Sequence, residues 1–140
     1  MKKLVTAGIV LLLICACSSE TERVIVKTYP DGNVELEHYY LFSGSDSVLI
    51  RETGYYPEGM KRIEGEYAES KREGRWTYWY DNGNKWSEAR FKAGLQHGKN
   101  TVWHENGTKY YEGNYKSGER TGVWKFWDEN GKLIKEVDYD

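Results

Sequence analysis

This sequence of 140 residues is poor in the residues that cross-link a small domain or bind metal ions. Its two cysteines, Cys15 and Cys17, both lie near the N-terminus, so the rest of the chain cannot form a disulfide. Its three histidines, His38, His97 and His104, have no cysteine near them and show no metal-ligand spacing. We therefore expect no metal site and no cofactor.

The sequence signatures of common enzymes are missing as well. The chain has no nucleophile-elbow motif, no phosphate-binding loop and no dinucleotide fingerprint. Glutamates do recur at one spacing, at Glu64, Glu88, Glu112 and Glu136. A catalytic carboxylate pair needs two different environments, whereas a regular ladder supplies nearly equal ones. We expect these glutamates to pair with Lys or Arg across strands, and we expect a protein that is not an enzyme.

An excess of basic residues is also absent. The chain has 20 basic and 22 acidic residues, and losing Lys2 and Lys3 with a leader would leave 18 against 22, a net charge of −4. A net negative charge argues against a general attraction to nucleic acid. Nucleic acid is therefore not an expected partner.

A long apolar run occurs once, at the N-terminus. Lys2 and Lys3 precede the apolar stretch Leu4–Ile14, which ends near Ala16. A bilayer-spanning helix needs about 18 residues or more, so this shorter run is typical of a secretory signal. Residues 1–16 are predicted to be that signal.

The junction Ala16-Cys17 resembles the cleavage box of bacterial lipoproteins, although Cys15 departs from the small non-cysteine residue that is usual there. The resemblance implies cleavage between Ala16 and Cys17, a lipid anchor on Cys17 and a polar tether over 17–23. Because no Asp follows Cys17, it favours the outer membrane of a bacterial cell envelope. An ordinary cleaved signal with an incidental cysteine remains the alternative.

The rest of the chain repeats with a period of 24 residues. One set of glycines has this step: Gly59, Gly83, Gly107 and Gly131. Two further sets keep it: Gly74, Gly98 and Gly122, and Trp79, Trp103 and Trp127. A fixed period of this size indicates a repeat array in which each unit packs only against its neighbours.

Each unit is predicted to be a β-hairpin. In residues 80–103 a turn at Gly83 precedes a candidate strand, Lys85–Phe91, and the polar connection Lys92–His97 precedes another, Gly98–Trp103. The predicted fold is all-β, an elongated antiparallel β-meander of 24-residue hairpin repeats. Its parts are a degenerate N-terminal repeat or cap (24–55), three full units (56–79, 80–103 and 104–127) and a half unit (128–140).

The N-terminal unit departs from this period. Between Tyr29 and Tyr56 the step is 27 residues, and we expect the excess to lengthen a connection at Ser43–Ser47. Val24–Thr28 would then be a capping strand. At the other connection, proline in Pro30-Asp31-Gly32 fixes φ near −65°. A type I turn followed by a left-handed glycine fits all units, so Gly59, Gly83, Gly107 and Gly131 are the predicted repeat-turn residues.

Strand alternation assigns side chains to faces. Trp76 and Trp124 should belong to one aromatic rib, and Asn100 interrupts this rib in the middle unit as either a tolerated defect or a polar notch. Exposed rings at Trp86, Tyr110 and Tyr111 form the candidate binding surface for a protein or a glycan. Alternation places Trp86 and Tyr110 on the face of the glutamates and Tyr111 on the other. Alternatively, these rings only shield the sheet's own faces.

The segment Gly74–Phe91, with its W-Y-D-N-G-N-K-W core, resembles the bacterial variant of the MORN repeat. Gly98–Tyr115 and Gly122–Tyr139 resemble it again. The resemblance implies a β-hairpin array that serves interaction or scaffolding, and a branch of the family is assigned the antitoxin role in toxin–antitoxin pairs. Our hypothesis is a lipid-anchored, non-enzymatic envelope protein that binds a protein partner or a glycan. The alternative is an antitoxin or immunity protein.

Overall fold

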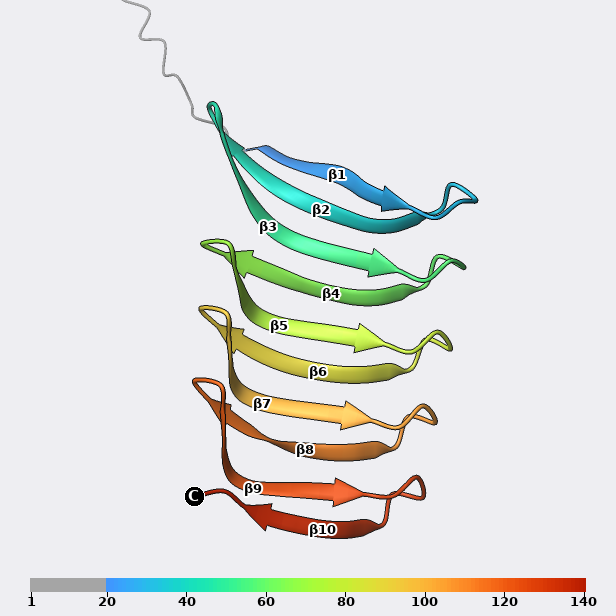
Figure 1. Ribbon diagram of the computed structural model, residues 1–140, viewed down its shortest axis with the longest axis vertical. Helices are drawn as coiled ribbons and strands as arrows, with labels where there is room; N and C mark the ends of the chain where they lie inside the picture. The colour runs from blue at the N-terminus through green and yellow to red at the C-terminus, as the bar shows by residue number, and fades with distance from the viewer. Residues whose placement is uncertain (1–19) are drawn as a thin grey trace, which may run out of the picture.

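The computed structural model describes residues 20–140, which form ten antiparallel strands in one sheet (Figure 1). The strands are β1 (Glu20–Thr28), β2 (Val34–Ser43), β3 (Asp46–Tyr55), β4 (Lys61–Ala68), β5 (Lys71–Trp79), β6 (Lys85–Lys92), β7 (Leu95–Trp103), β8 (Lys109–Lys116), β9 (Glu119–Trp127) and β10 (Leu133–Asp138). Their order in the sheet is their order in the chain, so the predicted antiparallel meander is confirmed.

The N-terminal predictions are tested only in part. The signal, the cleavage site Ala16-Cys17 and the lipid-bearing Cys17 lie outside the described residues. Strand β1 already begins at Glu20 and pairs with β2 from Glu20 to Thr28, so the last four residues of the expected tether 17–23 belong to the sheet. Within residues 20–140 no helix is long and apolar enough to span a membrane.

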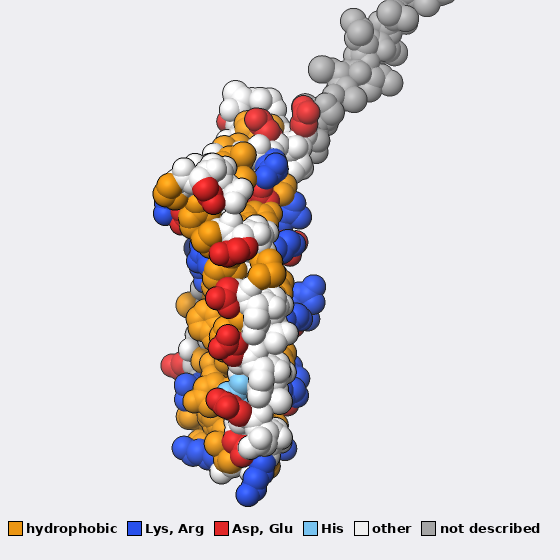
Figure 2. All heavy atoms as spheres, turned by 90° about the vertical axis from the view of Figure 1, so that its right-hand side faces the viewer, with side chains coloured by type: hydrophobic (Ala, Val, Ile, Leu, Met, Phe, Trp, Pro, Cys, Tyr) orange, Lys and Arg blue, Asp and Glu red, His pale blue; other side chains and the backbone are white. Residues whose placement is uncertain are grey.

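The molecule is a narrow ribbon in which each strand packs mainly on its chain neighbours (Figure 1). Seen from the edge that carries the longer turns, the ribbon is thin, with hydrophobic side chains gathered along one side (Figure 2). The buried hydrophobic residues of the described chain are Ile63, Trp76, Ala89, Val102 and Trp124. The core is therefore a row of side chains along one face, as expected for a quasi-one-dimensional repeat protein.

The predicted turn geometry is confirmed on one edge of the ribbon. The five repeat-turn glycines, Gly32 included, have φ between 79° and 89°, while the residues before them do not have positive φ. In one of these turns, the Gly83 N–H donates to the Tyr80 carbonyl at 3.1 Å, and the Tyr80 N–H donates to the Asn84 carbonyl at 2.9 Å. This is a type I turn closed by a left-handed glycine.

The turns on the opposite edge are shorter than predicted. The expected connection Lys92–His97 is wrong, because β6 continues to Lys92 and β7 begins at Leu95. The two remaining residues, Ala93 and Gly94, both have positive φ, 50° and 88°, as a type I′ turn requires. Sequence alone did not reveal this turn, because its first position carries an ordinary side chain rather than Asn or Gly.

The expected insertion at Ser43–Ser47 is also wrong. Strands β2 and β3 are joined by only Gly44 and Ser45. The three additional residues lengthen the strands instead, since β2 and β3 have 10 residues each, whereas β4 has 8 and β5 has 9. The N-terminal hairpin is therefore longer than the others without a longer loop.

The second glycine set bends the ribbon. Gly74, Gly98 and Gly122 lie inside strands but have φ of 66°, 93° and 63°. In the β4–β5 pair, Glu64 pairs with Thr77 and Glu66 pairs with Glu73, so Gly65 alone faces three residues of β5. Bulges of this kind bend a strand. Figure 1 shows β5, β7 and β9 curving sharply near their first residues.

Candidate binding groove on the aromatic face

One face of the sheet is charged. Glutamates pair across strands with buried or half-buried threonines, as in Glu64–Thr77–Glu88. The ion pairs are Lys61–Glu64 (2.6 Å), Lys85–Glu88 (2.8 Å), Lys109–Glu112 (2.7 Å), Lys99–Glu112 (3.2 Å) and Lys125–Glu136 (3.1 Å). Hydrogen bonds from Lys109 and Lys99 outweigh burial and lower the pKa of Glu112. The predicted salt bridging across strands is confirmed for Glu112 and Glu136, whereas Glu64 and Glu88 pair with a lysine of their own strand.

A bulge at the start of β6 decides which way Trp86 points. Lys85 and Glu88 are three residues apart and would face opposite sides of a regular strand, yet they form an ion pair. The register explains the contact: Trp79 pairs with Lys85 and Tyr78 pairs with Ser87, so Trp86 is an additional residue. A bulge re-aims its side chain, and Trp86 therefore joins Tyr78 on the aromatic face.

The same register shift recurs in β8. Trp103 pairs with Lys109 and Val102 pairs with Tyr111, which leaves Tyr110 as the additional residue. The prediction that Trp86 and Tyr110 share the glutamate face was therefore wrong. Alternation by twos fails at a bulge, and the sequence pattern alone gave no sign of the bulge.

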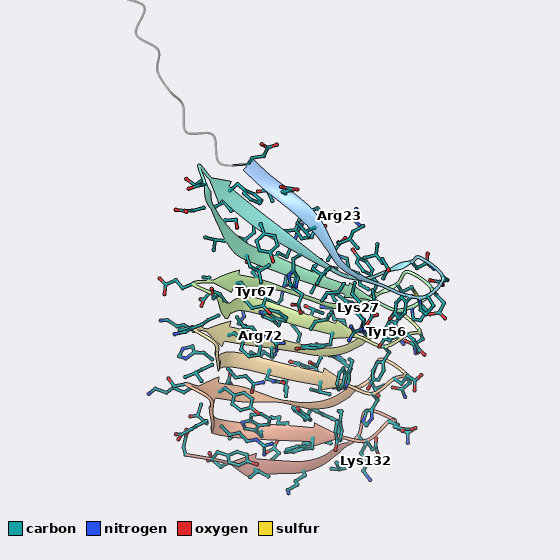
Figure 3. The ribbon with its side chains drawn as sticks, turned by 45° about the horizontal axis from the view of Figure 1, so that its top comes forward. Arg23, Lys27, Tyr56, Tyr67, Arg72 and Lys132 are labelled. Atoms are coloured by element: carbon teal, nitrogen blue, oxygen red, sulfur yellow. The ribbon has the colours of Figure 1, made fainter. Side chains whose placement is uncertain are left out.

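On the aromatic face, two tryptophans form the packed parts of the rib. Trp76 and Trp124 are fully buried, and each lies beneath a guanidinium, Arg72 at 4.0 Å and Arg120 at 4.7 Å from the ring centroids. Figure 3 shows Arg72 beside Tyr67 on the neighbouring strand. Tyr67 meets the Trp76 ring edge-on at 5.2 Å. These rings are held on both sides and leave no open space.

A small residue beneath each ring makes this packing possible. A Cβ at Gly65 would lie 2.0 Å from Trp76 Cδ2, and one at Gly113 would lie 2.2 Å from Trp124 Cδ2. Real carbon atoms do not approach so closely, so only glycine fits below each ring. In each case the ring comes from the next strand of the sheet.

The middle unit replaces these large side chains with smaller ones. Asn100 occupies the position of Trp76 and Trp124, Gln96 that of Arg72 and Arg120, and Val102 that of Tyr78 and Phe126. The result is an open groove of about 690 Å³. Its lining includes Trp86, Ser87, Ala89, Gln96, Asn100, Val102, Tyr110 and Tyr111. Of the two interpretations of Asn100, the structure supports the polar notch.

The walls of this middle-unit groove are aromatic and partly exposed. Trp86 is 46% exposed and meets the Tyr78 ring edge-on at 5.7 Å. Across the groove, Tyr110 is 44% exposed and packs against Tyr111 at 5.4 Å. All three candidate binding residues therefore line one site, including Tyr111, which was expected on the opposite face from the other two. Burial raises the pKa of the Tyr111 phenol.

An unpaired acceptor lies beneath the floor of the groove. Asn100 is only 5% exposed, and its Oδ1 has no hydrogen-bond partner in the described part of the chain. A buried acceptor without a partner costs about 1–3 kcal/mol. This oxygen has almost no accessible surface of its own, so it lies beneath the floor, while Asn100 as a residue lines the groove.

A ladder of side chains along the turn edge fixes the groove's outer rim. The hydroxyls of Tyr56 and Tyr80 donate to the carbonyls of Trp79 (2.8 Å) and Trp103 (2.9 Å), and Tyr56 is visible at this edge in Figure 3. His104 Nε2 donates in the same way to the Trp127 carbonyl at 3.0 Å. This ladder was not predicted from the sequence, although the recurrence of Tyr at this offset was its signal.

Hydrogen bonds between consecutive turns run alongside this ladder. Asn82 and Asn84 donate to the Glu105 carbonyl at 3.1 and 2.8 Å, and Asn106 donates to the Glu129 carbonyl at 2.9 Å. These bonds hold consecutive turns in one row. Because Tyr80 and His104 also line the groove, its rim is anchored to two neighbouring units.

The N-terminal end is held by a buried carboxylate. Glu37 is 1% exposed, forms an ion pair with Arg23 of β1 and accepts hydrogen bonds from Tyr55 (2.6 Å) and Tyr39 (2.9 Å). Burial raises the pKa of Glu37, but the bonds from Tyr55, Arg23 and Tyr39 outweigh it, and the net shift is downward. This cluster attaches β1 as a cap.

The histidines have local roles in the described chain. His38 lies between the Tyr40 hydroxyl (3.3 Å) and Glu52 (3.2 Å), and His97 Nδ1 faces the Ser117 N–H at 3.4 Å. Residues 20–140 contain no group of three or more His, Cys, Asp or Glu placed to hold a metal ion.

Comparison with protein families finds the MORN repeat variant in residues 72–93, 96–117 and 120–140. These three stretches are MORN-variant repeats. Each covers one hairpin of the ribbon, β5–β6, β7–β8 or β9–β10. The predicted resemblance is confirmed for these stretches, and MORN repeats generally serve as interaction modules. No curated protein and no solved structure matches the chain significantly.

The groove lies between the first two of these MORN repeats. Trp86 and Ala89 belong to the first, and Asn100, Tyr110 and Tyr111 belong to the second. The site is therefore a feature of how successive repeats stack, and no single repeat could form it.

Proposed function

We propose that this protein is a lipid-anchored, non-enzymatic interaction module of a bacterial envelope that binds its partner in the middle-unit groove. One observation carries the proposal: Trp86 and Tyr110 stand partly exposed as walls of one open groove that is also lined by the polar residues Ser87, Gln96 and Asn100. Exposed rings cost free energy in water. A bound partner would cover the rings and pair with the polar groups of the lining.

The anchoring part of the proposal is supported by the sequence. The apolar run before Ala16-Cys17 fits a lipoprotein signal. If Cys17 carries the lipid, only residues 18 and 19 separate it from β1. That stretch of chain spans at most about 11 Å, so the β1 end of the ribbon would lie near the membrane surface and the groove further out.

The non-enzymatic part is supported by the chemistry of the groove. Its described lining holds no carboxylate, and its histidine, His104, already directs Nε2 to the Trp127 carbonyl. The lining offers stacking surfaces and hydrogen-bonding groups, which suit recognition.

Photo-crosslinking in intact cells tests the site. A p-benzoylphenylalanine at Tyr110 should crosslink a partner, and the crosslink should disappear when Ala89→Gly with Asn100→Trp closes the groove. The same crosslinker at Ile134, which is 59% exposed on β10, is the control. Equal crosslinks from both positions, or none from Tyr110, would contradict the proposal.

Mass measurement of the mature N-terminus tests the anchor. We expect a chain that starts at Cys17 and carries acyl groups. An unmodified Cys17 would exclude the lipid anchor while leaving the groove proposal to the crosslinking result.

An immunity protein that neutralises a partner toxin is a second candidate, and the edge strand β1 favours it. Ile25 and Val26 are 51% and 49% exposed, and β1 pairs with β2 on one side. Such an edge can accept a strand from a partner. Co-expression with the product of a neighbouring gene should show protection that Val26→Lys removes. A neighbouring gene without toxicity would contradict this candidate.

A further inference from the structure

The middle-unit groove combines flat exposed rings with uncharged polar groups, and we infer that its ligand is a neutral oligosaccharide. In this assignment, sugar rings stack on Trp86 and Tyr110, and sugar hydroxyls pair with the neutral polar residues of the lining, Ser87, Gln96 and Asn100. The inference rests on the proposed interaction function and adds the chemical class of the ligand to it.

The spacing of the walls fits an extended ligand. Trp86 and Tyr110 occupy equivalent positions on β6 and β8, two strands apart in the sheet. Two strand spacings are about 10 Å, a separation that suits two sugar rings with one further ring between them in an oligosaccharide. The flat C–H face of a sugar ring can pack on an aromatic face much as other apolar groups do.

The charges around the groove favour an uncharged ligand. Arg72 supplies the guanidinium among the described lining residues. Its guanidinium carbon already lies 4.0 Å from the centroid of the Trp76 ring, and it donates a hydrogen bond to the Tyr78 hydroxyl at 2.9 Å. No carboxylate of the described lining could balance a cationic ligand. A Lys or Arg side chain from a protein partner would therefore meet rings without a counter-charge, near a fixed positive charge.

The floor supplies the groups that recognise hydroxyls. The neutral polar residues Ser87, Gln96 and Asn100 line the groove. Hydroxyl and amide groups both donate and accept hydrogen bonds, as sugar hydroxyls do. The volume, about 690 Å³, lies within the range of roughly 300–1,000 Å³ usual for small-ligand sites.

The flanking units suggest a variant that closes the groove without changing the backbone. Trp76 is accommodated by Gly65, and Ala89 is the equivalent of Gly65 in the middle unit. Ala89→Gly with Asn100→Trp would therefore install the packed arrangement of the neighbours. This variant should remain folded, which far-UV circular dichroism verifies, and it should lack the cavity.

Binding is measured by titration calorimetry and saturation-transfer NMR on the full chain in a zwitterionic detergent, because detergents with sugar head groups would compete. The probes are hexasaccharides of β-1,4-linked glucose, β-1,4-linked N-acetylglucosamine and α-1,4-linked glucose. A hexamer of galacturonate is the anionic comparison. We expect at least one neutral hexasaccharide to bind in preference to the anionic one.

The variants then locate the binding. Trp86→Ala and Tyr110→Ala should each weaken it about tenfold or more, as for aromatic hot spots. Asn100→Ala should weaken it about three- to tenfold, as expected for one hydrogen bond. The closed-groove variant should abolish binding, and Ile134→Ala should leave it unchanged.

Two outcomes would overturn the inference. One is that no neutral hexasaccharide binds, and the other is that binding persists in the closed-groove variant. If Tyr110 still crosslinks a groove-dependent protein in cells, the interaction function stands and the sugar assignment alone is wrong. If neither sugars nor proteins engage the groove, both proposals fail.

Discussion

The middle unit, residues 80–103, and the units on either side share one backbone but differ in what covers it. In the flanking units Trp76 and Trp124 are fully buried beneath Arg72 and Arg120. At the equivalent position the middle unit has Asn100, with an unpaired Oδ1 beneath the floor of an open groove. The 24-residue period therefore determines the backbone architecture, whereas departures from the period at a few positions create the groove.

The departure in the middle unit is coordinated. Where a tryptophan fills the rib, a glycine lies beneath it, as Gly65 does below Trp76 and Gly113 below Trp124. Where Asn100 replaces the tryptophan, the glycine is replaced by Ala89, which fits the smaller side chain. The middle unit differs from the flanking units at several neighbouring positions, and the smaller residues there together form the groove.

The largest expected difference between the two kinds of unit is the effect of truncating the rib residue. Trp124→Ala should lower the free energy of unfolding by about 3–5 kcal/mol, because it empties a fully buried site. Asn100→Ala should lower it far less or even raise it, since the packing that is lost is offset by removal of an unpaired buried acceptor that costs about 1–3 kcal/mol. Urea unfolding followed by circular dichroism measures both. Equal losses would show that Asn100 is a structural residue.

Substitution of the small residue beneath the rib, Gly65 or Ala89, should have the next largest effect on the free energy of unfolding. Gly65→Ala should destabilise by about 1–3 kcal/mol or more, because the new Cβ would lie 2.0 Å from Trp76 Cδ2. The reverse change in the middle unit, Ala89→Gly, should cost only about 0.5–1 kcal/mol of backbone entropy. The same urea titration compares them, and a neutral Gly65→Ala would mean that the Trp76 ring can move away.

These contrasts also separate what the sequence could predict from what it could not. The period, the meander and the glycine turns were predictable, because proline and left-handed glycine restrict φ wherever they occur. The two-residue turns were not, since Glu69 and Ser70 adopt positive φ against their preference. Their conformation is imposed by the paired strands on either side.

The site was predictable as a set of residues but not as a geometry. Trp86, Tyr110 and Tyr111 were identified as exposed rings, yet two of them were assigned to the wrong face. The cause is a one-residue bulge in β6 and in β8, which reverses the alternation before each ring. The ion pair between Lys85 and Glu88, three residues apart, reveals this bulge only once the structure is known.

A second comparison concerns two glutamates at equivalent offsets, the buried Glu37 and the half-exposed Glu64. Glu37→Gln should cost about 1–3 kcal/mol at neutral pH, because it removes the charge that pairs with Arg23. Glu64→Gln should cost about 0–1 kcal/mol, as usual for a surface pair with a lysine.

The pH dependence of stability should distinguish the same two residues. The pKa of Glu37 is lower in the folded protein than its ordinary value of 4.5. Its contribution is therefore fully present above about pH 4.5 and is lost as the pH falls through the folded value. Urea titrations between pH 7 and pH 3 should show a smaller acid-induced loss in Glu37→Gln than in the parent. An unchanged slope would mean that Glu37 does not control acid sensitivity.

The smallest expected effect lies in the two-residue turns, where the units again differ. Ser70 has φ of 60°, while its equivalents are Gly94 and Gly118. Left-handed backbone costs an ordinary residue about 1–2 kcal/mol, and glycine loses about 0.5–1 kcal/mol more backbone entropy on folding. Ser70→Gly should therefore stabilise the protein by about 0.5 kcal/mol.

The reverse substitution in the middle unit is the matched control for that turn. A Cβ at Gly94 would meet its nearest neighbour, Lys71 Cβ, at 3.5 Å, an ordinary contact, so Gly94→Ser tests backbone conformation without a clash. It should lower the free energy of unfolding by about the amount that Ser70→Gly adds, roughly 0.5 kcal/mol. If Gly94→Ser is neutral and Ser70→Gly destabilises, the left-handed conformation at this position is not what distinguishes the turns, and side-chain contacts of Ser70 must stabilise the first one.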